Sequence, residues 1–174
     1  MTTAMMIIGA YLVADFLSGF FHWLEDRYST EDMIWPIGEY IAKPNLRHHD
    51  RPTFMLMGNY WQRNYTTIIP SFTIAAVLWL CGAHWFWILS FVFLSQANEV
   101  HGLAHRMGKN PKWVEVLQEA GVFCSPRQHA HHHKSPHRIR YCVMTNLLNP
   151  ILDACLFWDA LEWILARFGV KVAR

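Results

Sequence analysis

The chain has 174 residues, of which 53% are hydrophobic and 16% are charged, and its formal net charge is +2. Soluble domains average about 25% charged residues, so this chain has unusually few. The small net charge and the lack of any basic run argue against a nucleic-acid-binding protein. The length predicts a single domain that covers residues 1–174.

Three apolar stretches predict membrane-spanning helices at about residues 4–23, 64–81 and 85–104. The first matches the ~20 residues needed to cross a bilayer, and its acid in mid-stretch argues against a cleaved signal peptide. Only Gly82-Ala83-His84 separates the second stretch from the third, which predicts a tight helical hairpin. A carboxylate in mid-span is costly, so Asp15 has either a helix-packing role or a role toward substrate.

Two later segments have apolar and polar residues at helical spacing. Residues 111–123 and 156–168 predict amphipathic helices that lie on a membrane surface without crossing it. The sequence therefore predicts an all-α integral membrane protein with about three transmembrane helices and additional interfacial helices. The cysteines are widely spaced and form no C-x-x-C pair, so we expect reduced, mostly buried thiols.

The predicted topology places nearly all of the histidines on one face of the membrane. If the first helix crosses the bilayer and the hairpin crosses and returns, ten of the eleven histidines share one side, and His84 in the hairpin turn is the exception. All fifteen Lys and Arg residues fall on the same side. The positive-inside bias identifies that side as cytoplasmic.

The spacing of these histidines is typical of metal binding, because neutral imidazole is a common metal ligand. His101 and His105 are four residues apart and share a helix face. In the His-x-x-His-His pattern, His129 and His132 are expected to share a face while His133 points elsewhere, so that one short helix serves two ions. The predicted set is His22, His48, His49, His101, His105, His129, His132 and His133, with His137 as a further metal candidate and His84 and His131 left out.

A ligating imidazole needs a hydrogen-bond partner for its other nitrogen, and nearby acids are candidates for that role: Glu25, Asp26, Asp50 and Glu99. Eight or nine histidines exceed the four ligands of one zinc site. No Glu has a His three positions later, which argues against the soluble type of di-iron bundle. We expect an imidazole-rich dinuclear centre, for which iron is plausible and copper and zinc stay open.

The motifs, taken in order, resemble those of the plasmanylethanolamine desaturase family of membrane lipid desaturases, which includes a plant plastid branch acting on the palmitoyl chain of phosphatidylglycerol. The resemblance covers about residues 11–170. It rests on segments 14–23 (ADFLSGFFHW), 47–52 (RHHDRP), 98–105 (NEVHGLAH), 117–121 (LQEAG) and 126–142 (PRQHAHHHKSPHRIRYC). A lone His-x-x-His-His would be weak evidence, but several motifs in order are specific.

The resemblance implies an oxygen-dependent membrane lipid desaturase with two non-haem irons. Such enzymes use O2 and electrons from cytochrome b5 or a ferredoxin to convert an alkyl ether to a vinyl ether, or to desaturate a fatty-acyl chain. The eight histidines above would be the catalytic ligands. His137 matches the plasmanyl branch only.

Basic residues on the histidine side suit a phospholipid headgroup or an acidic redox donor protein: Arg47, Arg51, Lys134, Arg138 and Arg140. Two alternatives to the desaturase stay open. A lipid hydroxylase could use the same kind of centre, because both reactions begin with hydrogen abstraction. A metal transporter or sensor is the other alternative, but a transporter should place its ligands near mid-membrane.

Overall fold

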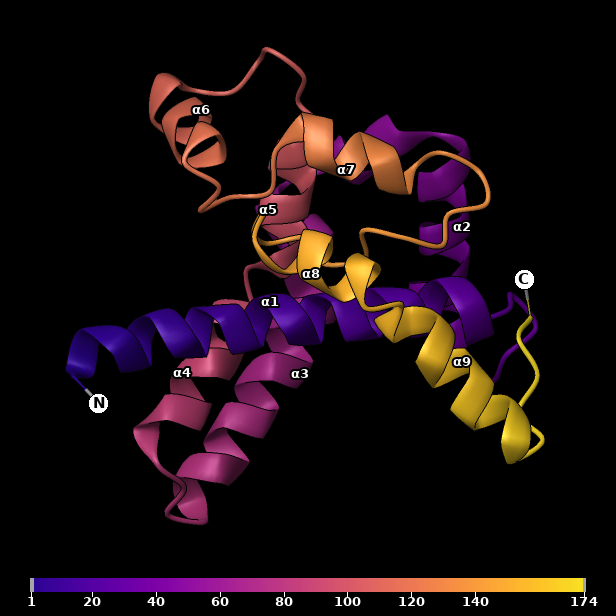
Figure 1. Ribbon diagram of the computed structural model, residues 1–174, viewed down its shortest axis with the longest axis horizontal. Coiled ribbons are helices and arrows are strands. Elements are labelled where there is room, and N and C mark those ends of the chain that lie inside the picture. The colour runs from indigo at the N-terminus through magenta and orange to yellow at the C-terminus, as the bar shows by residue number, and fades with distance from the viewer. Residues whose placement is uncertain (1, 174) are drawn as a thin grey trace.

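The computed structural model describes residues 2–173, and this part of the chain contains helices and loops but no β-strand (Figure 1). The predicted all-α class is confirmed. The α-helices are α1 (Thr3–Tyr28), α2 (Lys43–Asp50), α3 (Tyr60–Leu80), α4 (Trp85–Leu94), α5 (Ala97–Ala104), α6 (Lys112–Glu119), α7 (Pro126–His132), α8 (Leu148–Ala154) and α9 (Phe157–Arg167). A π-helical turn, η1 (Gly38–Ala42), leads into α2, and a 3-10 turn, η2 (Pro52–Leu56), follows it.

The predicted spans match these helices in part. Among the described residues, α1 is the one helix that is long and apolar enough to cross a membrane. The second stretch is α3, which begins with a capping box between Asn59 and Gln62. The third is broken: α4 has 10 residues and ends at Leu94, and α5 begins at Ala97. Ser95 turns its hydroxyl back to the Val92 carbonyl (2.7 Å) at this break, as polar side chains that compete for backbone groups often do.

The histidine-bearing helices gather on one side of α1. In the view of Figure 1 the α3–α4 hairpin extends below α1, whereas α2, α5 and α7 lie above it. His84 caps α4 at the hairpin turn, where its Nδ1 accepts from the Phe86 amide at 3.2 Å. The turn lies at the end of the hairpin far from α2, α5 and α7, so His84 is separated from the histidines of those helices.

The extended segment 141–145 lies along α1 and is bonded to it. The Asp15 carboxylate accepts from the backbone N–H groups of Met144 (2.9 Å) and Thr145 (3.0 Å) and from the Thr145 hydroxyl (2.5 Å). The Ser18 hydroxyl accepts from the Val143 N–H at 3.2 Å. Asp15 is fully buried, and these three bonds assign it a packing role.

Gly19 allows this segment to approach the helix closely. A Cβ at position 19 would lie 2.5 Å from the sulfur and 2.9 Å from the backbone nitrogen of Cys142. The Asn149 side chain holds Cys142 from the other side, accepting from its N–H (2.9 Å) and donating to its carbonyl (2.7 Å). The Asp15-x-x-Ser18-Gly19 pattern therefore serves to fix residues 141–145.

One part of the buried core lies where this segment meets α1 and α9, and another where it meets α1, α4 and α5. Trp23, Tyr141 and Trp158 form one cluster, and the Tyr141 and Trp158 rings lie 5.1 Å apart between centroids. The predicted segments 111–123 and 156–168 are the helices α6 and α9. Both present large apolar side chains at the surface, with Trp113 61% and Trp163 59% exposed.

All four cysteines are free thiols. Cys124 and Cys142 are buried, but Cys81 and Cys155 are exposed. The expectation that the thiols are mostly buried is therefore wrong for these two, because apolar neighbours in sequence mark a buried position only where another element covers that helix face.

Candidate metal centre

Two adjacent groups of nitrogen and oxygen atoms could each hold a metal ion. The first, which we call the five-histidine group, contains His48, His101, His105, His129 and His133. The second, the mixed group, contains His22, Asp26, His49 and His132. Within each group the candidate ligand atoms all lie within 4.8 Å of one another. The structure thus brings together all eight histidines of the predicted set, from four separate segments.

Helical spacing explains how each segment serves these groups. His101 and His105, four apart on α5, both enter the five-histidine group, and the adjacent His48 and His49 divide between the two groups because neighbours on a helix point about 100° apart.

The α7 histidines divide differently from the prediction. His129 joins His133 in the five-histidine group, and His132 lies in the mixed group. Residues three and four apart both neighbour each other on a helix, so spacing alone could not decide this pairing.

The imidazole nitrogens of the five-histidine group face one another. The Nε2 atom of His129 lies 2.7 Å from that of His101 and 3.0 Å from that of His133. Two neutral imidazoles cannot both present lone pairs at this distance without repulsion, unless a proton or a cation lies between them. A metal–nitrogen bond of ~2.1 Å places neighbouring ligands at right angles roughly 3 Å apart, so the observed spacing suits a bound ion.

Several buried ligand atoms have no hydrogen-bond partner within the described residues. They include both ring nitrogens of His48, Nε2 of His22, Nε2 of His132 and Oδ2 of Asp26. Leaving a buried polar atom unpaired costs about 1–3 kcal/mol. His48 belongs to the five-histidine group and the other three residues to the mixed group, so one cation in each group would provide these atoms with a partner. The residues present therefore fit a dinuclear metal centre.

Backbone carbonyls hold the outward nitrogens of two histidines in the mixed group. Nδ1 of His22 lies 3.0 Å from the Tyr141 carbonyl oxygen, and Nδ1 of His132 lies 2.8 Å from that of Ile139. A carbonyl accepts only from an N–H, so Nδ1 carries the proton in both rings and Nε2 presents its lone pair inward. Residues 139–141, which α1 helps to fix, therefore orient two candidate ligands.

Two of the acids that the sequence predicts as hydrogen-bond partners of the histidines, Asp26 and Glu99, have different roles in the structure. Asp26 lies inside the mixed group, with its oxygens 2.8 Å from Nε2 of His49 and 3.1 Å from Nε2 of His132. The sequence reasoning missed it as a candidate ligand, although its spacing of four from His22 equals that of His101 and His105. Glu99 instead contacts Arg63 and Asn64, each at 2.9 Å.

The electrostatics favour metal-binding protonation states. Burial, with nearby histidines, lowers the pKa of His48 and His129, brings that of His105 to about 4 and that of His133 to about 2. Burial alone would raise the pKa of Asp26, but His22, His132 and His49 outweigh it and hold this pKa well below its usual range. Neutral imidazole and carboxylate are the forms that bind metals.

The remaining histidines lie outside both groups. His137 is half-buried, with its ring 4.8 Å from that of His49, but its Nε2 lies 3.2 Å from the His133 carbonyl oxygen and it belongs to neither group. His131 is exposed on α7. His84 is at the hairpin turn described above.

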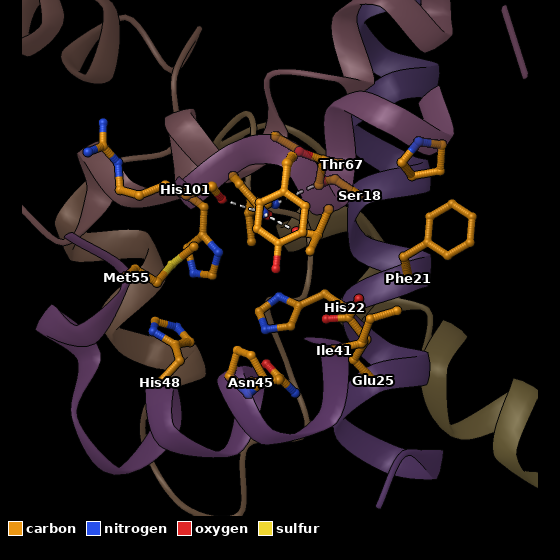
Figure 2. A pocket seen from close by; sticks show the side chains of 18 of the residues that line it. Ser18, Phe21, His22, Glu25, Ile41, Asn45, His48, Met55, Thr67 and His101 are labelled. Carbon is orange, nitrogen blue, oxygen red and sulfur yellow. Dashed lines mark hydrogen bonds between the residues drawn. The ribbon is translucent and has the colours of Figure 1, made fainter. Parts of the chain in front are cut away.

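A cavity of about 500 Å³ adjoins the metal centre. His22, His48 and His101 form part of its wall (Figure 2). Apolar side chains from α1, α3 and α4 line much of the remainder, including Phe21, Ile74, Phe91 and Leu94. An apolar cavity with metal-ligating groups on one wall suits an extended hydrocarbon substrate.

Comparison with known proteins agrees with this geometry. The family model described as the lipid desaturase domain matches residues 11–173. The chain belongs to the lipid desaturase family. The resemblance stated from the sequence is therefore confirmed, and the histidine segments all lie within the matched region.

Relatives within the lipid desaturase family come from distant sources. The chain is 29% identical to a probable fatty acid desaturase of Acanthamoeba polyphaga mimivirus, over 95% of this chain and 84% of that protein. It is 30% identical to plasmanylethanolamine desaturase 1 of Mus musculus, over 90% of this chain and 62% of that protein. It is 28% identical to the chloroplastic fatty acid desaturase 4 of Arabidopsis thaliana, over 92% of this chain and 51% of that protein. It thus spans half to two-thirds of the length of these last two relatives. No solved structure matches the chain.

Proposed function

We propose that this protein is a membrane-bound desaturase that introduces a double bond into a hydrocarbon chain of a phospholipid at a histidine-ligated di-iron centre. The observation that carries the proposal is the shared wall between the two ligand groups and the apolar cavity, at His22, His48 and His101. An alkyl ether chain, converted to a vinyl ether, and a fatty-acyl chain are the two substrates that the names of the relatives suggest.

The chain's own residues would hold two ions. The five-histidine group would bind one, and His22, Asp26, His49 and His132 the other. Iron in these positions would supply the reduction of O2 that removes two hydrogens from the substrate. The balanced reaction takes one O2, two electrons and two protons, and releases two waters for each double bond. The electrons must come from a separate donor protein, for which cytochrome b5 and ferredoxin are the candidates.

The cavity would position the chain and exclude water. A hydrocarbon chain in contact with Phe91 and Leu94 is driven from water by the hydrophobic effect, and its burial next to His101 brings its methylene groups to the centre. A water-poor site also limits side reactions of activated oxygen.

The apolar surfaces support a placement in the membrane. We propose that α1 and the α3–α4 hairpin are embedded in the bilayer, with the metal centre at its cytoplasmic face. Large apolar residues at the surface support this placement, including Ile8 (60% exposed), Phe72 (49%), Trp79 (69%) and Leu80 (75%). Exposed apolar area of this extent is unusual on a soluble monomer. The exposed Trp113 and Trp163 would place α6 and α9 in the headgroup layer.

Lipid analysis of cells that express the chain tests the proposal. New acid-labile vinyl ethers identify an alkyl ether substrate, and a new double bond in phospholipid acyl chains identifies an acyl substrate. His129→Ala should abolish the product, and His131→Ala, on the same helix but outside both groups, should retain it. An unchanged lipid profile in cells that hold folded, metal-loaded protein and a donor would contradict the function.

A further inference from the structure

Within the described part of the chain, Arg63 is the one lysine or arginine that lines the cavity. It lies in the first turn of α3, next to Gln62, which also lines the cavity. The five basic residues that the sequence suggested for a headgroup are absent from the cavity wall. Arg138 contacts Asp159 and Glu162, each at 2.9 Å, and Arg140 contacts Asp153 at 2.8 Å.

The Arg63 guanidinium is fixed in position before any ligand arrives. It donates to the Gly58 carbonyl at 2.8 Å and to both oxygens of Glu99 at 2.9 and 3.2 Å. Its side chain is only 14% exposed. A guanidinium has five N–H donors, so the bonds to Gly58 and Glu99 do not exhaust its capacity.

Arg63, Arg106 and Glu99 together carry a net positive charge. Glu99 is shared between Arg63 and Arg106, whose Nη2 lies 3.7 Å from the carboxylate. Two guanidinium groups on one carboxylate leave a net charge of +1. Cations with fixed geometry and a partly apolar environment are the groups that bind phosphate in proteins.

The start of α3, which carries Arg63, is hydrogen-bonded to α5, which carries two histidines of the five-histidine group. The Asn98 side chain donates to the Arg63 carbonyl at 3.0 Å. His101, a member of the five-histidine group, follows Asn98 by three residues on the same helix, a rise of about 4.5 Å along the helix axis. The apolar residues Ile74, Phe91 and Leu94 line the part of the cavity that extends along α3 and α4 toward the hairpin turn.

We propose that Arg63 binds the phosphate of the lipid headgroup, so that the polar end of the substrate chain lies beside His101 and its tail extends toward Ile74 and Phe91. This inference rests on the proposed lipid substrate. In this proposal Arg63 distinguishes a lipid that carries a phosphate from a neutral glycerolipid, and Glu99 holds Arg63 in place.

The test measures lipid binding directly. Delipidated, metal-loaded protein in detergent is titrated with dioleoyl phosphatidylglycerol and with dioleoylglycerol, and bound lipid is counted by native mass spectrometry. Arg63→Gln should weaken phosphatidylglycerol binding at least about tenfold, because a hydrogen bond to a charged group contributes about 1.5–3 kcal/mol. Dioleoylglycerol binding and metal content should not change. Arg63→Lys should restore part of the phosphatidylglycerol affinity, and the exposed Arg47→Gln is the matched charge control.

A second variant separates recognition from simple structural support. Glu99→Gln removes the carboxylate that competes for Arg63, so phosphatidylglycerol should bind as tightly as to wild type or more tightly. If the Arg63–Glu99 pair only stabilises the fold, Arg63→Gln and Glu99→Gln should weaken the binding of phosphatidylglycerol and of dioleoylglycerol equally. That result would show that the proposal is wrong. It is also overturned if Arg63→Gln binds phosphatidylglycerol normally, or if inorganic phosphate displaces this lipid at equal concentration. Wild-type protein that binds lipid through Arg63 but forms no double bond would overturn the proposed function alone.

Discussion

Replacing Asp15 with alanine tests how α1 supports the metal centre from a distance. The Asp15 carboxylate is fully buried and accepts three hydrogen bonds, two from the backbone of Met144 and Thr145 and one from the Thr145 hydroxyl. Asp15→Ala leaves these donors without an acceptor. At about 1–3 kcal/mol for each unpaired backbone donor, and about 1 kcal/mol for the hydroxyl, the expected loss of unfolding free energy is about 3–7 kcal/mol.

The loss should extend to metal binding through residues 139–141. This segment precedes the one that Asp15 fixes, and its carbonyls orient the rings of His22 and His132. Loss of such outer partners typically costs 10–100-fold in metal affinity. Asp15→Asn retains one carbonyl-type acceptor for both backbone donors, so it should lie between wild type and Asp15→Ala.

The assay combines thermal unfolding in detergent with metal titration. The exposed Asp32→Ala is the control for removing a carboxylate and should change the unfolding free energy by less than about 0.5 kcal/mol. Asp15→Ala protein that keeps wild-type stability and metal affinity yet loses activity would refute the packing role, and would point instead to a contact with substrate.

Three further predictions concern the metal centre itself. Asp26→Ala should reduce bound metal from about two ions to about one, because it removes a ligand from the mixed group alone; metal analysis that still finds two ions would contradict this. Metal-free protein should lose stability as the pH falls from about 6.5 to about 4. Burial lowers the pKa of His105 to about 4 in the folded chain, whereas histidines of the unfolded chain take up protons from about pH 6.5. Thermal unfolding at several pH values checks this, and a stability that does not change with pH would contradict it. His105→Ala should abolish turnover and His84→Ala should not, and an essential His84 would refute the proposed membrane topology.

Much of the candidate site could be predicted because a histidine in an apolar chain indicates a function more often than a packing role. Eleven histidines in an apolar chain have little use in packing, and the spacings at 101–105 and 129–133 limit which faces can converge. The sequence predicts Asp26 only as the hydrogen-bond partner of a ligating imidazole, because spacing alone does not distinguish an acid that binds the metal from one that supports a ligand. Only the fold shows that it points among His22, His49 and His132.

The fold was predicted well where hydrophobic periodicity is strong and less well where tertiary contacts decide. The hairpin at residues 82–84 follows from the sequence. The break at Ser95 and the path of residues 141–145 do not. At the break the Ser95 carbonyl accepts from the Thr67 hydroxyl, 28 residues away, and residues 141–145 depend on hydrogen bonds to Asp15. The place of Arg63 beside the cavity likewise depends on its contact with Glu99, 36 residues away.

The central claim, that the two ligand groups form one dinuclear iron centre, is tested most directly by metal analysis of protein purified from iron-supplied cells. Metal content is measured together with iron X-ray absorption spectra of the wild type and of His132→Ala. We predict about two irons per chain, a shell dominated by imidazole ligands, and about one iron after the His132 change. A single zinc per chain without iron, or two irons that persist in His132→Ala, would contradict this account.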